Sequence, residues 1–159
     1  MMIVHPFPPV FDGDSHILIL GSFPSVKSRE QGFYYGHPQN RFWKVLAALY
    51  DDPIPSDIDE KKVFLASHHI ALWDVIASCE ITGSADSSIR DVQPNDIASL
   101  LAGSSVTRVF TNRKTADVLY RKYQIPRGAP NAVCLPSTSP ANAAWSLPKL
   151  TEAWRVILS

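Results

Sequence analysis

The sequence predicts an α/β fold: a four-stranded parallel sheet with helices on both faces, forming a three-layer α/β/α sandwich. Short apolar segments of β-like pattern alternate along the chain with segments of helical periodicity. The apolar segments are nearly unbroken, as in strands whose two faces are both covered. With 159 residues, 45% hydrophobic and 19% charged, the chain is expected to form one domain over residues 1–159.

Four segments are expected to form the sheet. The first, at 16–21, is a continuous apolar run bounded by turn residues, which is typical of a central strand. The others are expected at 70–73, 106–110 and 132–135, and polar or turn residues follow each of them. Strands joined by helices run parallel, so the carboxyl ends of all four should share one edge.

Helices are expected between these strands and after the last one. Their predicted ranges are 41–50, 60–67, 96–102, 114–123 and 149–158. Asn95 before the third helix matches a side-chain cap, and Gly103 after it matches a left-handed helix end.

Ligands of open parallel sheets bind outside the carboxyl ends of the strands. Four connections lie there, namely 22–40, 74–95, 111–113 and 136–147. The first is long for a connection without clear periodicity, and such loops are usually functional. It is therefore the first place to look for chemistry.

Two of these loops carry recognisable motifs. The first contains GSFPSVKS at 21–28 and FYYGHPQNRFW at 33–43, and the last contains LPSTSPAN at 135–142. This arrangement resembles the uracil-DNA glycosylase superfamily. The HPQNRFW segment is similar to the His-Pro-x-Asn-Arg-Phe-Trp motif of its mismatch-specific branch, and the last loop resembles the superfamily's second motif, which enters the DNA minor groove.

The resemblance is closest to the hypoxanthine-DNA glycosylase branch and spans essentially the whole chain. It implies a monofunctional base-excision repair enzyme that flips a deaminated base, most simply hypoxanthine, out of double-stranded DNA. Hydrolysis of the N-glycosidic bond would then leave an abasic site. No lysine is recognisable at the motif positions, so no strand cleavage through a Schiff base is expected.

The chain departs from the superfamily at its catalytic position. Most members place Asn or Asp where this chain has Phe23, and a phenyl ring can neither orient nor deprotonate water. The hypoxanthine branch shares this loss, and its catalytic asparagine corresponds to Asn40. Asn40 is thus the predicted water-positioning residue, with helix capping as the alternative role. His37 is a secondary candidate, as a donor to a leaving-group oxygen or a phosphate.

Asp74, which follows the second predicted strand, is the carboxylate alternative to Asn40. We favour a capping role for it. Because a carboxamide is not a true base, a mechanism led by Asn40 depends on stabilising the leaving group. Hypoxanthine suits this requirement, since its negative charge can spread onto O6.

Three residues are predicted to contact the base. Tyr35 corresponds to the aromatic residue that stacks on the flipped base in the mismatch-specific branch, and Phe23 lies beside it in the first motif. Asn112 offers an amide that matches O6 and N1–H of hypoxanthine, or else it caps the following helix. Four other aromatic residues are expected to pack inside the protein: Phe33, Tyr34, Phe42 and Trp43.

The resemblance also implies a DNA-contacting surface formed by both motif loops. Its predicted contacts are Ser25, Lys27, Ser28, Ser137, Ser139, Pro140 and Asn142. Ser137 stands where classical uracil enzymes carry histidine, so uracil is expected to be a poor substrate. Arg113 either reaches a phosphate or narrows the pocket, and the segment 86–90 is expected to be structural.

Composition narrows the remaining possibilities. Equal numbers of basic and acidic residues, 15 each, mean that DNA is bound by a local patch. Cys79 and Cys134 are expected to be buried thiols in a reducing compartment, and too few ligands are present for a metal site. No signal peptide or membrane span is expected at the N-terminus. The sequence thus favours a cytoplasmic monomer without metal or cofactor.

Three alternatives remain open at this point. A uracil- or mismatch-directed glycosylase would keep the fold and change only the fit of the pocket. A non-catalytic protein that binds DNA lesions is also compatible with Phe23 at the usual catalytic position. An enzyme acting on free nucleotides is less compatible, because no glycine-rich phosphate loop is present.

Overall fold

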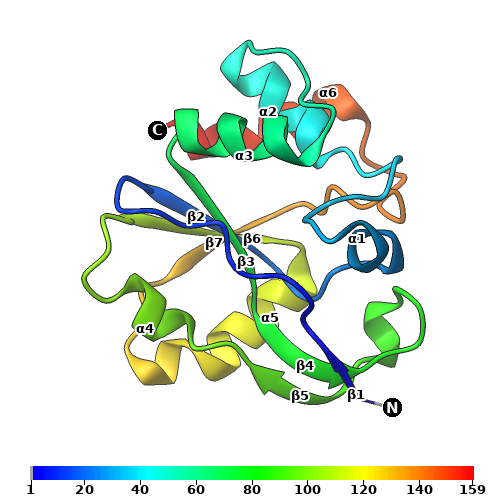
Figure 1. Ribbon diagram of the computed structural model, residues 1–159, viewed down its shortest axis with the longest axis vertical. Coiled ribbons are helices and arrows are strands. Elements are labelled where there is room, and N and C mark those ends of the chain that lie inside the picture. The colour runs from blue at the N-terminus through cyan, green and yellow to red at the C-terminus, as the bar shows by residue number, and fades with distance from the viewer. Residues whose placement is uncertain (1) are drawn as a thin grey trace.

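The computed structural model describes residues 2–159 and contains a four-stranded parallel sheet in the order β3-β2-β6-β7 (Figure 1). Its strands are β2 (Ile17–Gly21), β3 (Ile70–Asp74), β6 (Arg108–Asn112) and β7 (Ala132–Leu135). All neighbouring pairs are parallel, and β2 is central. The predicted sheet, its shared carboxyl edge and its central strand are therefore confirmed.

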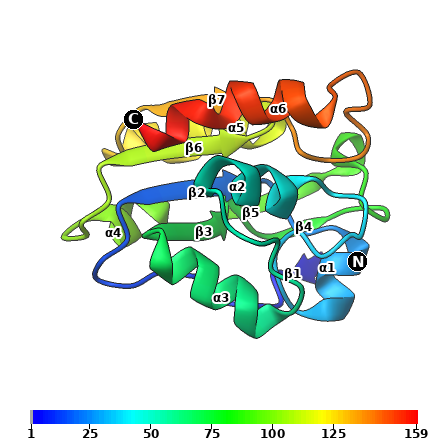
Figure 2. The ribbon, with the colours of Figure 1, turned by 90° about the horizontal axis from the view of Figure 1, so that it is seen from above.

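Helices cover both faces of this sheet, which confirms the three layers (Figure 1). One layer contains α2 (Phe42–Tyr50), α3 (Ile58–Ser67) and α6 (Leu147–Trp154), which continues as the 3-10 turn η3 (Arg155–Leu158). Figure 2 looks down on this layer, with α2 between α6 and α3. The opposite layer contains α4 (Ile97–Leu101) and α5 (Lys114–Tyr123), followed by the 3-10 turn η2 (Ile125–Arg127).

Successive side chains of the central strand β2 pack alternately into the cores on the two faces of the sheet. Ile17 and Ile19 pack into the core beneath α2, α3 and α6, whereas Leu18 and Leu20 pack into the core shared with α4 and α5. Because successive side chains of a strand point to opposite faces, β2 must be apolar at every position. This requirement explains the unbroken apolar run in the sequence.

A second, antiparallel sheet was not predicted. It has the order β1-β4-β5 and consists of β1 (Met2–Val4), β4 (Ile76–Glu80) and β5 (Arg90–Pro94). The short 3-10 turn η1 (Asp86–Ser88) lies between the last two strands. These strands carry many polar residues, and their pairing shifts in register between β4 and β5, so neither strand has clean alternation.

Helix α1 (Val26–Gln31) was also not predicted, because it lies inside the first motif loop. Ser25 caps it by accepting a hydrogen bond from the Ser28 backbone N–H, and Gly32 ends it in the left-handed conformation with φ 78°. The loop is therefore partly helical. This turn of helix places the Ser25 and Ser28 side chains against each other.

Several predicted boundaries are corrected by strand and cap geometry. β6 extends to Asn112 because Thr111 and Asn112 pair with β7, so these residues belong to the strand and not to a loop. Asp96, not Asn95, caps α4 by accepting from the Ser99 N–H. Asn95 instead donates through Nδ2 to the Asp74 carbonyl. Gly103 has the predicted left-handed conformation, with φ 74°.

The prediction for the cysteines is half right. Cys79 is buried against the second sheet, but Cys134 is exposed. The reason is its position on β7, an edge strand of the parallel sheet, where the neighbouring Val133 is also 44% exposed. Partial burial nevertheless raises the pKa of the Cys134 thiol.

Residues 2–159 contain neither a helix that could span a membrane nor a group of side chains that could hold a metal ion. None of the helices described there is long and apolar enough to cross a bilayer. In the same part of the chain, no three His, Cys, Asp or Glu side chains gather closely enough to hold a metal ion. A chemistry without metal or cofactor stays a prediction from sequence.

Candidate active site

A small enclosed cavity lies at the carboxyl edge of the parallel sheet, where three strand ends meet. Gly21, Asp74 and Asn112, the last residues of β2, β3 and β6, form its floor. Its volume is about 40 Å³. Six residues predicted from the sequence line it: Phe23, Ser25, Ser28, Tyr35, Asn40 and Asn112. The two motif loops and the strand ends therefore form one site, which we call the base cavity.

Two wider grooves adjoin the base cavity. One, of about 270 Å³, contains His37 and Pro140 together with Asn40. The other, of about 610 Å³, contains Ser137 and Asn142 of the last motif loop. Asn40 belongs to both the base cavity and the first groove, so it lies at the boundary between an enclosed pocket and an open surface.

The side chain of Asn40 caps the start of α2 from one residue before the N-cap position, where Arg41 makes no side-chain cap bond. Its Oδ1 accepts from the Phe42 N–H at 2.9 Å, at the start of α2. This bond uses one lone pair of the amide and fixes its orientation. The Nδ2 group has no partner among residues 2–159 and remains available to a ligand or water. The capping bond is thus present, and catalysis by Asn40 stays a prediction.

Tyr35 lies against Phe42 with ring centroids 3.9 Å apart and an interplanar angle of 14°. Phe42 covers one face of the ring, so a base could stack only on the other. The Tyr35 hydroxyl is buried without a hydrogen-bond partner among the described residues. Burial, together with nearby Asp74, raises its pKa, against a smaller opposing effect of Asn112 and Arg113, so the hydroxyl stays a proton donor.

Asn112 is 1% exposed and bonded to Thr138 at both ends of its amide. Nδ2 donates to the Thr138 hydroxyl at 3.0 Å, and Oδ1 accepts from the Thr138 N–H at 3.1 Å. The Asn112 side chain therefore does not cap α5, which begins without a side-chain cap. One N–H and one lone pair remain on the amide, so base contact by Asn112 stays a prediction.

The capping role favoured for Asp74 is wrong, because the residues after it form β4 and not a helix. Its side chain is 5% exposed, and Oδ2 lies 2.8 Å from Nε2 of His5. His5 was not predicted, because only the fold brings it beside Asp74, which is 69 residues away in the sequence. The signal for Asp74 was present: a carboxylate directly after an apolar strand.

The predicted phosphate contacts on α1 differ in their burial. Ser28 is buried, and its hydroxyl accepts hydrogen bonds from the Ser25 hydroxyl and the Gly36 N–H. Lys27 is exposed and lies 3.5 Å from Glu30, so its ammonium is free to move toward a phosphate. His37 accepts from the Gln39 N–H through Nδ1, a bond that stabilises its loop.

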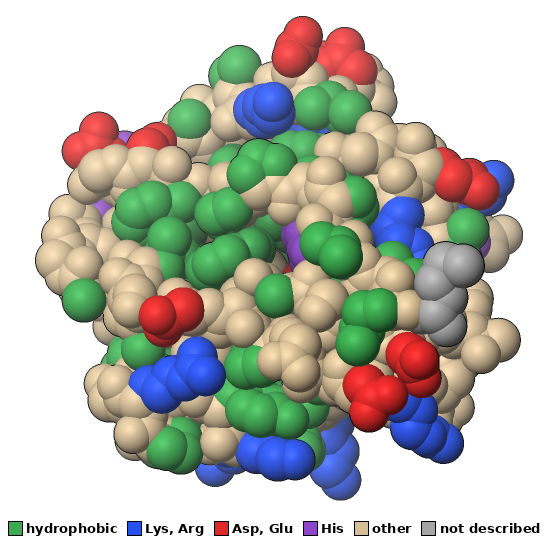
Figure 3. All heavy atoms as spheres, turned by 60° about the horizontal axis from the view of Figure 1, so that its bottom comes forward, with side chains coloured by type: hydrophobic (Ala, Val, Ile, Leu, Met, Phe, Trp, Pro, Cys, Tyr) green, Lys and Arg blue, Asp and Glu red, His purple; other side chains and the backbone are tan. Residues whose placement is uncertain are grey.

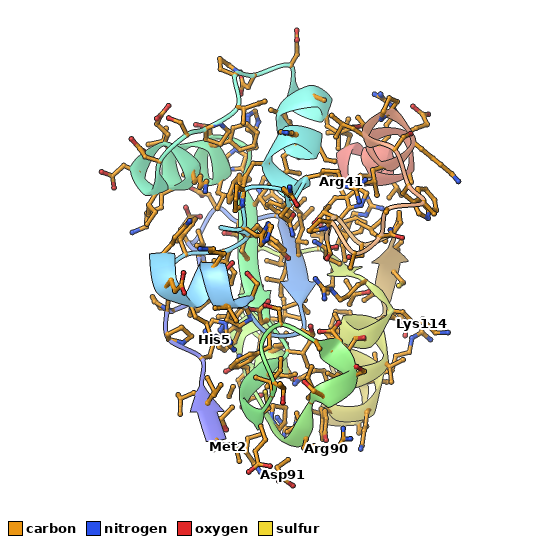
Figure 4. All side chains as sticks on the ribbon, turned by 90° about the vertical axis from the view of Figure 1, so that its right-hand side faces the viewer. Met2, His5, Arg41, Arg90, Asp91 and Lys114 are labelled. Atoms are coloured by element: carbon orange, nitrogen blue, oxygen red, sulfur yellow. The ribbon has the colours of Figure 1, made fainter. Side chains whose placement is uncertain are left out.

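The last motif loop is held in place by Arg41, which the sequence reading did not single out. Its guanidinium donates to the carbonyls of Ser139 and Asn142, each at 3.0 Å, and to that of Trp145. The Arg41 N–H donates to the Thr138 carbonyl at 3.0 Å. Figure 4 shows Arg41 at the start of α2, facing this loop. Arg41 therefore ties the two motifs together.

Arg113 closes one side of the base cavity. Its guanidinium lies 2.8 Å from the Asp86 carboxylate, which also accepts a hydrogen bond from the Ser22 hydroxyl. Arg113 lines the base cavity and both grooves, so it lies where they adjoin. The loop of Asp86 has structural bonds of the kind expected there: the Ser88 hydroxyl accepts from the Thr82 N–H and donates to the Ala85 carbonyl.

Comparisons with known proteins agree with this geometry. The model of the uracil DNA glycosylase superfamily matches residues 8–158. A protein of Methanosarcina acetivorans named hypoxanthine DNA glycosylase is 35% identical, over 98% of both chains. One of the same name from Methanosarcina barkeri is 33% identical over 70% of this chain and 72% of its own.

Structure comparison gives the same family. A solution NMR structure of a candidate uracil DNA glycosylase from Methanosarcina acetivorans has a TM-score of 0.80 and is 30% identical, with full coverage of both chains. From the cavity at the strand ends, the two motif loops and these matches, we conclude that the chain belongs to the uracil DNA glycosylase superfamily.

Proposed function

We propose that this DNA glycosylase excises hypoxanthine from deoxyinosine in double-stranded DNA and leaves an abasic site. The observation that carries the proposal is the position of Asn40 between the enclosed base cavity and the open groove. A flipped nucleotide with its base in the cavity and its phosphates in the groove would have its sugar beside Asn40. The names of the two Methanosarcina relatives support hypoxanthine as the base.

The reaction is hydrolysis at the anomeric carbon of the flipped nucleotide. A water oxygen forms a bond to C1′ while the bond from C1′ to N9 breaks and its electron pair leaves with the base. The base then takes up a proton, and the water gives one up to solvent. Asn40 orients this water with its amide, which the bond to the Phe42 N–H holds fixed.

Simple hydrolysis is favoured because no lysine is among the described residues that line the base cavity. A Schiff base with C1′ would need such an amine. The leaving base gains negative charge, and hypoxanthine can place it on O6 where a hydrogen-bond donor stabilises it. Tyr35 offers a protonated hydroxyl inside the cavity for this purpose.

The base cavity must open before a purine can enter. Its volume of about 40 Å³ is close to the share of one water molecule, about 30 Å³. The Arg113 and Asp86 side chains bridge its entrance and are each only about a quarter exposed. We propose that DNA binding displaces Arg113 toward a phosphate, since an arginine can exchange a carboxylate for a phosphate partner.

The DNA path follows the two grooves. Lys27 and Ser25 lie on the side of α1, and Ser137, Ser139, Pro140 and Asn142 lie on the other side of the entrance. Rigid Pro140 and its small neighbours would fill the space that the flipped nucleotide leaves in the helix.

The test is a panel of labelled duplexes that differ in one base: hypoxanthine, xanthine, uracil or adenine. We expect abasic sites, revealed by alkali, in the hypoxanthine duplex and no strand cleavage before alkali is added. Cleavage of uracil with none of hypoxanthine would contradict the proposal and favour a uracil-directed enzyme.

The role of Asn40 is tested by two substitutions that differ in helix capping. Asn40→Ala removes both the amide and the cap, whereas Asn40→Ser keeps an acceptor for the Phe42 N–H. We expect both variants to lose at least about 100-fold in single-turnover rate, a typical loss for a positioned polar catalytic group. Only Asn40→Ala should lose stability, by about 1 kcal/mol.

Binding separates the enzyme from a lesion-binding protein. Both Asn40 variants should hold hypoxanthine duplexes about as tightly as the unchanged chain, because phosphate contacts dominate the affinity. A chain with no turnover and strong lesion binding before any substitution would contradict the enzymatic proposal.

A further inference from the structure

Two polar atoms in the base cavity are available for hydrogen bonds to a ligand. Asp74 Oδ1 and the Tyr35 hydroxyl oxygen lie over Gly21, at 2.5 Å and 3.3 Å from the position that a β-carbon would take there. The Tyr35 hydroxyl is buried without a hydrogen-bond partner among residues 2–159. The hydrogen bonds of Asp74 use Oδ2 and the backbone carbonyl, which leaves Oδ1 free to accept. A buried hydroxyl without a partner is rare, and a ligand that supplies the missing bond explains it.

Asp74 is held from behind by His5, which lies beneath α1 in Figure 4. His5 contacts the Phe7 carbonyl through Nδ1 and Asp74 Oδ2 through Nε2, both at 2.8 Å. A carbonyl can only accept, so Nδ1 carries a hydrogen. The second contact then shares one proton between Nε2 and Oδ2. Asp74 thus has Oδ2 occupied by His5 and presents Oδ1 to the cavity as an acceptor.

The two free atoms are of opposite hydrogen-bonding type. Asp74 Oδ1 accepts, and the Tyr35 hydroxyl is a donor whose pKa is raised by burial. Hypoxanthine presents a donor at N1 and an acceptor at O6, side by side on one edge. Adenine presents an acceptor at N1 and an amino group at C6, which is the opposite pattern. Position 21 must also be glycine, because the β-carbon of any other residue would collide with Asp74 Oδ1.

We propose that Asp74 and Tyr35 read the pairing edge of the flipped base, with Asp74 accepting from N1–H and Tyr35 donating to O6. This inference rests on the proposed function, since it takes hypoxanthine as the base. It assigns that edge to these residues in place of Asn112, whose amide is held by two bonds to Thr138 and keeps only one N–H and one lone pair. It also gives Tyr35 an edge contact in place of stacking. His5 is a positioning residue for Asp74.

The contact of Asp74 is tested by pairing a protein change with a base change. Single-turnover cleavage is measured for the unchanged chain and Asp74→Ala on duplexes with inosine or N1-methylinosine. A hydrogen bond to a charged group is worth about 10- to 150-fold, so N1-methylation should slow the unchanged chain by at least about tenfold. It should slow Asp74→Ala by less than about threefold, because the variant has no acceptor to lose and has room for the methyl group.

Equal slowing of both proteins by the methyl group would overturn the assignment of Asp74. If instead the unchanged chain cleaves uracil and leaves inosine intact, the proposed function fails, and the two failures are therefore distinct. Folding of Asp74→Ala is checked by its thermal midpoint, and the comparison of two bases within one protein cancels a general loss of activity.

Tyr35→Phe gives an independent test that a merely structural role would not pass. The hydroxyl has no partner in the described protein, so its removal should leave the thermal midpoint unchanged or raise it. Cleavage of inosine should nevertheless fall by about tenfold, whereas a purine base that lacks O6 should be affected less than threefold. Unchanged cleavage of inosine by Tyr35→Phe would overturn the donor role.

His5 is tested by removal and by conservative replacement. His5→Ala should reduce the discrimination between inosine and N1-methylinosine by at least about fivefold, because Asp74 Oδ2 loses its partner. His5→Gln can still donate to that oxygen, so it should restore most of the discrimination. A lower thermal midpoint with unchanged discrimination in His5→Ala would show that His5 only stabilises the fold and would overturn its positioning role.

Discussion

At the scale of single residues, Arg41 shows how one side chain can set the geometry of two motifs. Its backbone begins α2 beside Asn40, and its guanidinium holds three carbonyls of the last motif loop. A planar guanidinium has five donors in a fixed fork, which an ammonium group does not reproduce. Arg41 therefore fixes the last motif loop relative to the Asn40 side chain.

Replacing Arg41 by lysine should uncouple the two motifs. We expect Arg41→Lys to lower the free energy of unfolding by about 1–3 kcal/mol, because at least two carbonyls lose a charged donor. DNA affinity should also fall, by about tenfold or more, as the loop loses its fixed position. Urea unfolding and duplex binding measure the two effects. Arg155→Lys, in an exposed pair with Glu152, is the matched control and should change neither. Unchanged stability and DNA affinity of Arg41→Lys would show that the last motif loop keeps its position without the guanidinium.

At the scale of elements, the junction between β6 and α5 stores backbone strain at the cavity entrance. Arg113 stands at this junction with φ 97° and ψ 159°, a region used almost only by glycine. The conformation turns its side chain to Asp86, in the 3-10 turn between β4 and β5. The strained junction and the ion pair together keep the entrance narrow.

Two substitutions at position 113 separate strain from charge. Arg113→Ala loses the ion pair and keeps the strain, whereas Arg113→Gly loses both. We expect the glycine variant to be more stable than the alanine variant by about 1–3 kcal/mol in urea unfolding. Asp86→Ala serves as the control, since it removes the ion pair without altering the junction. Equal stability of the two position-113 variants would argue against strain.

At the scale of the whole molecule, charge is balanced and scattered. The chain has 15 basic and 15 acidic residues, and on the face drawn in Figure 3 the described Lys and Arg side chains form small separate groups among acidic ones. Attraction to DNA must therefore come from a few cations near the site, such as Lys27 on α1. The enzyme differs in this respect from proteins that hold DNA by a continuous basic face.

The salt dependence of DNA binding distinguishes a local patch of cations from a continuous basic face. We expect the logarithm of the binding constant to fall with the logarithm of salt concentration with a slope of about −2 to −4, as for two to four phosphate contacts. Lys27→Ala should make the slope shallower by about 1. Lys122→Ala, at the end of α5 far from the strand ends, should leave it unchanged. A slope near −10 would contradict a local contact patch.

The sequence alone determined the parallel sheet, its central strand, both helical layers and the family. The signals were local: the run at 17–20 is apolar at each position because both faces are covered, and the motif from His37 to Trp43 is continuous in the chain. Such patterns can be recognised in the sequence without knowing which distant segments are in contact. The same stretch of sequence indicated Asn40 and Tyr35, which both line the base cavity.

Only the tertiary structure decided what completes the site. β1 pairs with β4, and His5 reaches Asp74, across long stretches of chain that show no matching pattern in the sequence. Asp74 looks the same in sequence whether it caps a helix or faces a cavity. Contacts between distant segments depend on the packing of the whole chain. The second sheet and the His5–Asp74 pair could therefore be identified only from the tertiary structure.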